Sequence, residues 1–190
     1  MCSRYFLELK ALMELEDKID YPFELALKDK IDYYPSDNIF IIENNNDKLI
    51  GSKARWGYKI FDNKLVINAR QETIQEKSLF KKDIINHRCI IPANGFYEWD
   101  IHKHKFTFEN ENGQLMMMAG LYRIVNGQKE VAIITTDANE SMEGIHQRMP
   151  LIFNYQQKNI WLKSNDYKYL LKVKPLPLKI ISGSLQTSLF

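Results

Sequence analysis

The chain has 190 residues, of which 45% are hydrophobic and 26% charged, which fits one domain (residues 1–190) around one core. No apolar run approaches the ~20 residues of a membrane helix, no secretory signal is visible, and two cysteines make no disulfide framework. We therefore expect a cytoplasmic, monomeric protein with no membrane contact, whose net charge of +2 is too small to argue for nucleic-acid binding.

The first half of the chain predicts helices around a pair of strands. Apolar residues at helical spacing indicate a helix over 6–19. Strands are expected over 39–42 and 49–54, on either side of an Asn-rich turn. Another helix over 78–85 precedes the apolar run 89–92.

Two Asn-Gly pairs in the second half are strong hairpin signals. Asn112-Gly113 is expected to join strands over 106–108 and 115–121. Asn126-Gly127 is expected to lead into a strand over 131–135.

The last part of the chain predicts a strand over 151–153, helices over 156–163 and 167–172, and a strand over 179–181. Many hairpins with helices grouped at either end predict an α+β fold, a curved, barrel-like mixed β-sheet flanked by helices. There is no Gly-rich phosphate loop and no metal-ligand cluster, so we expect no cofactor and no metal.

Cys2 follows the initiator directly. If Met1 is removed, the mature chain begins with a 1,2-aminothiol, whose α-amine has a pKa near ~7.7–8 against ~10.4 for lysine. Nitrogen and then sulfur of such a group can attack an aldehyde and close a five-membered thiazolidine. The alternative is that Cys2 is only a small hydrophobic residue at the end of the chain.

Polar side chains stand in apolar surroundings at two further places before position 100. Asn68 and Arg70 follow an apolar run and share a face if the strand continues. They can then offer an amide and, beside it, a guanidinium that binds phosphate through two donors. Glu98 lies between Tyr97 and Trp99 and is either an exposed strand residue or a carboxylate held for proton transfer.

His146 has the same ambiguity between a structural and a catalytic role. Arg148 lies two residues away and Pro150 fixes the local backbone, which makes a positioned acid–base histidine credible. Arg55-Trp56 places an arginine beside an aromatic ring, a pairing that suits stacking on nucleobases.

Five segments, in order, resemble the SRAP family, named for SOS response-associated peptidase and also known as abasic-site processing proteins. They are Met1–Tyr5, Arg55–Gly57, Ile67–Arg70, Arg88–Trp99 and Ile145–Pro150. Together they span about four fifths of the chain. Ser3 stands where the family usually has glycine, and the segment between Trp56 and Asn68 is shorter than usual.

The resemblance implies a function in DNA damage repair. Family members bind abasic sites in single-stranded DNA and form a covalent protein–DNA crosslink through the N-terminal cysteine, which shields the lesion. By resemblance, the catalytic residues are Cys2 as nucleophile with Asn68, Glu98 and His146, and the DNA-binding residues are Arg4, Trp56, Arg70, Trp99 and Arg148. Glu98 is expected to move protons, His146 to assist ring opening or reversal, and Asn68 to orient the Cys2 terminus or the sugar.

Three alternatives stay open. An N-terminal-nucleophile amidohydrolase can also use a freed cysteine, but it needs a layered α/β sandwich. The peptidase in the family name implies that Cys2 with Glu98 and His146 could cleave the initiator or a propeptide, and a lyase activity on DNA is a related possibility. A non-catalytic single-stranded DNA-binding module would need the arginines and tryptophans without Cys2.

Overall fold

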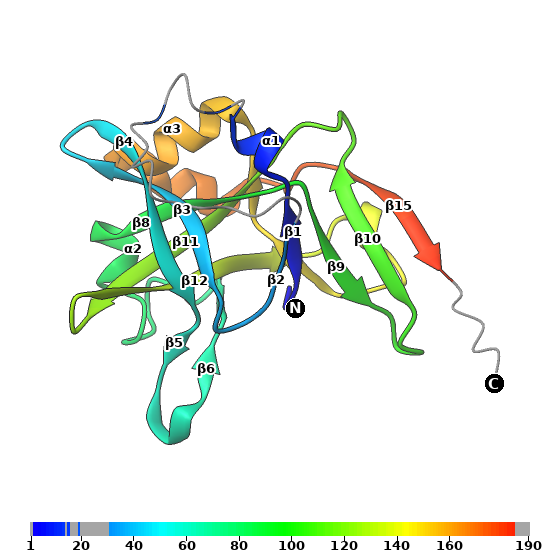
Figure 1. The fold of residues 1–190 in the computed structure, drawn as a ribbon, viewed down its shortest axis with the longest axis horizontal. Helices are drawn as coiled ribbons and strands as arrows, with labels where there is room; N and C mark the ends of the chain where they lie inside the picture. The colour runs from blue at the N-terminus through cyan, green and yellow to red at the C-terminus, as the bar shows by residue number, and fades with distance from the viewer. Residues whose placement is uncertain (1, 14, 16–18, 20–30, 185–190) are drawn as a thin grey trace.

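The computed structural model describes residues 2–13, 15, 19 and 31–184 (Figure 1). Its β-strands are β1 (Tyr5–Leu7), β2 (Ile31–Tyr33), β3 (Asn38–Asn45), β4 (Lys48–Trp56), β5 (Tyr58–Lys59), β6 (Leu65–Val66), β7 (Asn68–Arg70), β8 (Arg88–Ala93), β9 (Gly95–Trp99), β10 (Lys105–Asn110), β11 (Met116–Val125), β12 (Gln128–Asp137), β13 (Arg148–Pro150), β14 (Ile152–Phe153) and β15 (Leu178–Ser184). Its helices are α1 (Leu9–Met13), α2 (Asp83–Asn86), α3 (Tyr155–Lys163) and the 3-10 helices η2 (Phe61–Asn63), η3 (Glu140–Met142) and η4 (Asn165–Lys172).

Five strands form a closed ring in which β3 pairs with β4, β4 with β12, β12 with β11, β11 with β8, and β8 with β3. The β4–β12 pair is parallel and the others are antiparallel, so the sheet is mixed. Closure removes the unpaired edges of these strands. The barrel-like mixed sheet predicted from the sequence is confirmed.

A second, open sheet has the order β15-β10-β9-β1-β2, and it lies beside the ring in Figure 1. The chain passes from one sheet to the other at Asn94, whose N–H donates to the carbonyl of Phe6 and whose side chain accepts from the N–H of Glu8. Gly95 follows, where a Cβ would lie 2.5 Å from the carbonyl oxygen of Phe108. This tight crossing holds β1, and therefore the N-terminal segment, against β9.

Helix α3 packs over β8 and begins with a capping box between Asn154 and Gln157. The indole of Trp161 donates to the carbonyl of Cys89 at 2.9 Å. Arg88 donates to four main-chain carbonyls around this helix and α2, and its ring contacts include Tyr167 at 4.0 Å. Arg88 therefore joins these elements through several hydrogen bonds, a role that suits arginine because its planar guanidinium carries several N–H donors.

The expected strands of the first half are present and longer than predicted, as β3 and β4. The hairpin at Asn126-Gly127 is also confirmed, because β11 pairs with β12 through Val125 and Gln128 and both turn residues have positive φ. The C-terminal strands and helix α3 lie where the sequence predicts them, and the second helix there is the 3-10 helix η4.

Three predictions need correction. Residues 5–7 are a strand, because Tyr5–Leu7 is buried and pairs with both β2 and β9, and helix α1 begins only at Leu9. Of the expected helix 78–85, only Asp83 onward is helical. The turn at Asn112-Gly113 exists, but β10 and β11 do not pair, because each joins a different sheet.

Trp56 is the last residue of β4 and belongs to the core. Its side chain is fully buried, contacts the Tyr5 ring at 5.4 Å and donates its indole N–H to the carbonyl of Ile67 at 3.1 Å. Trp99, at the end of β9, is only partly buried. The two tryptophans therefore have different structural roles.

We expect the Trp56→Phe substitution to lower the free energy of unfolding by about 2–4 kcal/mol, because it leaves a void and removes the bond to the Ile67 carbonyl. Trp99→Phe is the matched control and should cost less than about 1 kcal/mol. Urea unfolding followed by circular dichroism measures both. Equal losses for the two variants would contradict the core assignment of Trp56.

Candidate functional site

The N-terminal segment runs into the protein interior at Cys2, which is fully buried. The side-chain amide of Asn68 donates to the main-chain carbonyl of Cys2 at 3.0 Å. The thiol lies 3.9 Å from the carbonyl oxygen of Arg4, within reach of a weak S–H bond. Asn68 thus fixes the backbone on which the nitrogen and sulfur of Cys2 are mounted.

The pKa of the Cys2 thiol is raised, first by burial and then by the negative charge of Glu98. Glu98 is itself 4% exposed on β9. A thiol in these surroundings stays protonated at neutral pH, so it is a poor nucleophile until a base takes its proton. Cys2 alone does not behave as an activated thiolate.

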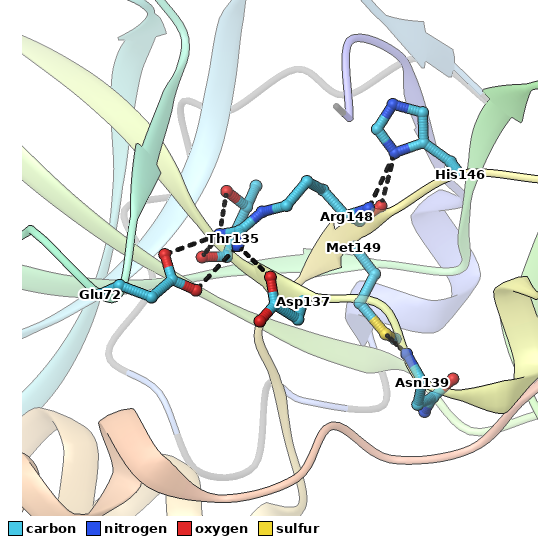
Figure 2. Close-up of polar contacts among 7 residues, drawn as sticks. All are labelled: Glu72, Thr135, Asp137, Asn139, His146, Arg148 and Met149. Atoms are coloured by element: carbon cyan, nitrogen blue, oxygen red, sulfur yellow. Dashed lines mark hydrogen bonds and ion pairs between the residues drawn. The ribbon is translucent and has the colours of Figure 1, made fainter.

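His146 completes the group of predicted catalytic side chains. Its Nε2 lies 4.0 Å from Oε1 of Glu98. On the other side of the ring, Nδ1 accepts the main-chain N–H of Arg148 at 2.9 Å and lies 3.0 Å from the same residue's carbonyl oxygen (Figure 2). Nδ1 thus has both an amide donor and a carbonyl acceptor within reach, and Nε2 is the nitrogen nearest Glu98. The structure therefore brings Cys2, Asn68, Glu98 and His146 together.

Arg4 lies between two tyrosine rings, with its guanidinium carbon 4.8 Å from the centroids of both Tyr34 and Tyr97. It forms an ion pair with Asp32, which also accepts the hydroxyl of Tyr97 at 2.9 Å. Burial alone would raise the pKa of Asp32, but the hydrogen bonds from Arg4 and Tyr97 outweigh it and lower that pKa. Arg4 is held in one orientation, and Tyr34 is 45% exposed.

The guanidinium of Arg148 is bound by other residues of the protein. Its guanidinium donates to both carboxylate oxygens of Glu72, to Asp137 and to the carbonyl of Thr135 (Figure 2). Only 12% of its side chain is exposed. The resemblance assigns a DNA contact to Arg148, whereas its observed partners belong to the protein.

The remaining predicted DNA-binding residues fall into two groups. Arg70 is exposed at the end of β7, on the same side of the strand as Asn68, which confirms that the two side chains share a face. Trp99 is partly buried and, by strand alternation, shares a face with Tyr97, while Glu98 points to the opposite face. For Trp56 the prediction of a DNA contact is wrong, because its ring is fully buried in the core.

Sequence reasoning missed the partners of the arginines, which are Asp32, Tyr34, Tyr97, Glu72 and Asp137. Two of them carried a local signal: Glu72 lies two residues after Arg70, and Tyr97 precedes Glu98. The other three, Asp32, Tyr34 and Asp137, have no such signal, because only the fold brings them to their arginines.

Within residues 2–13, 15, 19 and 31–184 there is no group of three or more His, Cys, Asp or Glu side chains that could hold a metal ion. In the same part of the chain, none of the helices has the length and apolar character needed to cross a membrane.

The chain is similar to known proteins over most of its length. The family model described as SOS response associated peptidase (SRAP) matches residues 1–181. "Abasic site processing protein YoqW" of Bacillus subtilis is 35% identical over 189 residues, covering 90% of this chain and 84% of YoqW. "Abasic site processing protein YedK" of Escherichia coli is 24% identical over 177 residues, covering 86% of this chain and 80% of YedK.

Solved structures share the fold. A crystal structure of a protein from Bacteroides thetaiotaomicron superposes with a TM-score of 0.79 at 22% identity, covering 95% of this chain and 92% of that chain. The sequence match spans Cys2 and the three residues gathered around it, Asn68, Glu98 and His146. The chain therefore belongs to the SOS response associated peptidase (SRAP) family.

Proposed function

We propose that this protein processes abasic sites in single-stranded DNA by forming a covalent thiazolidine crosslink through Cys2, after removal of Met1. The observation that carries the proposal is the arrangement of polar groups around Cys2. Asn68 holds its carbonyl, Glu98 lies close enough to raise the pKa of its thiol, and His146 stands 4.0 Å from Glu98. Relatives named abasic site processing proteins support the choice of substrate.

The reaction follows from the two nucleophiles of a terminal cysteine. The α-amine of Cys2 attacks C1′ of the ring-opened sugar to give a carbinolamine, and loss of water gives an imine. The thiol then adds to the imine carbon, its proton moves to nitrogen, and the five-membered ring closes. Since the thiol is protonated, nitrogen attacks first and sulfur second.

Glu98 and His146 move the protons that this sequence requires. Glu98 takes a proton from the attacking amine and returns it to the departing hydroxyl, which leaves as water. His146, whose Nε2 faces Glu98, exchanges a proton with the sugar oxygen during ring opening or reversal. Asn68 keeps the terminus in position, which limits the freedom lost on reaching the transition state.

Arg4, Tyr34 and Trp99 would contact the DNA strand beside the abasic site, with Arg70 supplying a phosphate contact. Arginine neutralises phosphate, so this share of the affinity should weaken with salt. Bases beside an abasic gap are free to stack on exposed aromatic rings, and Tyr34 and Trp99 are the partly exposed rings of this group.

The competing functions have less support. An N-terminal-nucleophile amidohydrolase needs a layered α/β sandwich, and this fold is a closed mixed barrel with few helices. A non-catalytic DNA-binding module gives no reason for burying Cys2 beside Glu98 and Asn68. Self-cleavage at the initiator remains compatible with the proposal, because it would expose the same terminus.

The first prediction concerns the crosslink itself. Protein incubated with a single-stranded oligonucleotide carrying one abasic site should give a heat-stable adduct on a denaturing gel. The intact mass of the adduct should equal the mass of the protein without Met1 plus that of the oligonucleotide, less one water. Cys2→Ala should abolish the adduct, because the ring needs both nucleophiles. Cys89→Ala is the matched control, since Cys89 is equally buried but lies in the barrel. An undiminished yield of adduct in Cys2→Ala would refute the proposal.

The second prediction separates the two effects of Glu98. Glu98→Gln removes the negative charge that helps to raise the pKa of the Cys2 thiol, so at fixed pH alkylation by iodoacetamide should become faster at Cys2. In the same variant, crosslinking should slow by about 10²–10⁴-fold, because the proton carrier is lost. Peptide mass spectrometry measures the alkylation. Cys89, whose thiol pKa is raised by burial and by Glu43, serves as the internal reference. Slower alkylation of Cys2 would argue against the assigned charge effect.

The third prediction concerns DNA stacking. Trp99→Phe should remove most of the fluorescence quenching caused by abasic DNA, because Trp56 and Trp161 are fully buried. Loss of a stacked base is worth about 1–3 kcal/mol, so affinity should fall by roughly 5- to 150-fold if the ring stacks. Trp161→Phe provides the control that keeps the quenching. Quenching that survives in Trp99→Phe would place the DNA elsewhere.

A further inference from the structure

Residues 100–105, which we call the basic turn, lead from the end of β9 into β10 and have the sequence Asp-Ile-His-Lys-His-Lys. They project from the open sheet at the end where β1 begins (Figure 1). We propose that the basic turn binds the phosphates of the single DNA strand on one side of the abasic site. The inference rests on the proposed function and adds a contact for the DNA beside the lesion.

The register of the strands places the basic turn beside the proposed reaction site. Tyr5 of β1 lies opposite Phe96 of β9 in an antiparallel pair. The chain from Tyr5 back to Cys2 therefore runs in the same direction as β9 from Phe96 forward to Glu98. At a rise of ~3.3 Å per residue, the turn begins at Asp100, roughly 7 Å beyond Glu98 along the strand. DNA that holds its abasic sugar at Cys2 must leave the site close to this turn.

Hydrogen bonds to Asp100 give the basic turn a fixed shape. Its Oδ1 accepts the main-chain N–H groups of His102 at 2.9 Å and His104 at 2.8 Å, and its Oδ2 lies 2.9 Å from Nδ1 of His104. The N–H of Lys103 donates to the carbonyl of Asp100 at 3.1 Å. Because the backbone is already ordered, a ligand that binds the side chains of the turn loses little free energy in ordering it.

The two lysines of the turn carry charge that no ion pair neutralises. Asp100 is bound within the turn, and Asp32 pairs with Arg4 and feels Lys105 only at longer range. Among the residues that the structure describes, no carboxylate lies within ion-pair distance of Lys103 or Lys105. Lys103 is also exposed. Both ammonium groups therefore remain available for phosphate.

Contacts between cations and aromatic rings connect the turn to the other proposed DNA contacts. Nζ of Lys105 lies 4.1 Å from the ring centroid of Tyr97, and the guanidinium carbon of Arg4 lies 4.8 Å from the same centroid. Lys105 is also paired with Trp99 across the two strands, so their side chains share a face. A strand that stacks a base on Trp99 would therefore bring a neighbouring phosphate toward Lys105.

Ile101 indicates which anion the turn binds. Its side chain is 89% exposed and contributes little to the core. An apolar side chain next to two lysines suits a single strand, which offers bases as well as phosphates, better than it suits a free inorganic anion. Single-stranded DNA is therefore the ligand that fits both features of the turn.

The double variant Lys103→Gln/Lys105→Gln tests the proposal. Anisotropy of a labelled single-stranded oligonucleotide with a central abasic site measures Kd, in a Cys2→Ala background so that no crosslink forms. At low salt, Kd should rise about three- to tenfold. The slope of log K against log salt should fall by about 1.4, because each phosphate contact with a single strand contributes about 0.7. Lys81→Gln/Lys82→Gln removes two exposed charges beside α2, on the other side of the molecule in Figure 1, and should change neither value.

Trimmed oligonucleotides show whether the contact is local. One probe keeps a long flank only on the 5′ side of the abasic site, and the other keeps it only on the 3′ side. With one of the two probes, the double variant should bind as tightly as the parent, because the nucleotides that meet the turn are missing. Equal losses of affinity with both probes would contradict the proposal, since they would mean that the lysines act only through the general field of the protein.

Single-turnover crosslinking with Cys2 intact separates this proposal from the proposed function. The double variant should keep the parent's rate constant at saturating abasic DNA and need more DNA for half saturation, because its lysines contact no reacting atom. An unchanged Kd and salt slope with the full-length probe would overturn the proposal. Absence of any crosslink in the parent protein would refute the proposed function, and the anisotropy measurements would then still decide whether the basic turn binds DNA.

Discussion

The site depends on the position of β12, a strand shared by the closed ring and by two short strands outside it. Its first half pairs with β4 and β11, and its second half pairs with β7 and β13. Asn68 begins β7, and His146 stands two residues before β13. The barrel thus places an amide and an imidazole from distant parts of the chain on opposite edges of one strand, where hydrogen bonds fix both.

The second requirement is a held N-terminus. Chain ends fray unless a strand or another element ties them down. Here β1 pairs with β2 on one edge and with β9 on the other, and Asn94, just before β9, adds hydrogen bonds to Phe6 and Glu8. This binding makes it possible to bury Cys2 completely only three residues before β1 begins. The residue proposed as the nucleophile is therefore held by the strands around it.

Charge in this protein is organised in pairs close to the site. Arg4 has Asp32, and Arg148 has Glu72 and Asp137, so these two of the arginines expected to bind DNA already have protein partners. Arg70 is exposed, and Tyr34 and Trp99 offer aromatic surface near Arg4 and Tyr97. Arg4 and Arg148 are therefore held by protein partners, whereas Arg70 and Tyr34 are exposed.

The hairpin at Asn126-Gly127, the helix before Ser164 and the barrel-like sheet were predictable, because turn chemistry and apolar periodicity are local signals. The strand at Tyr5–Leu7 was not predictable, since its apolar residues fit a helix equally well and only pairing with β2 and β9 decides between the two. Asn112-Gly113 likewise specifies a turn, but a turn does not say whether its flanking strands will pair with each other.

The candidate reactive groups, which are Cys2, Asn68, Glu98 and His146, are recognisable from their residue types and from five segments in family order. Tertiary structure alone decided which of the neighbouring side chains are accessible. Packing against Tyr5 buries Trp56, and Glu72 and Asp137 bind Arg148, although neither contact is visible in the sequence. The physical reason is that chemical identity belongs to a residue, whereas burial and ion pairing depend on partners brought near by strand pairing far along the chain.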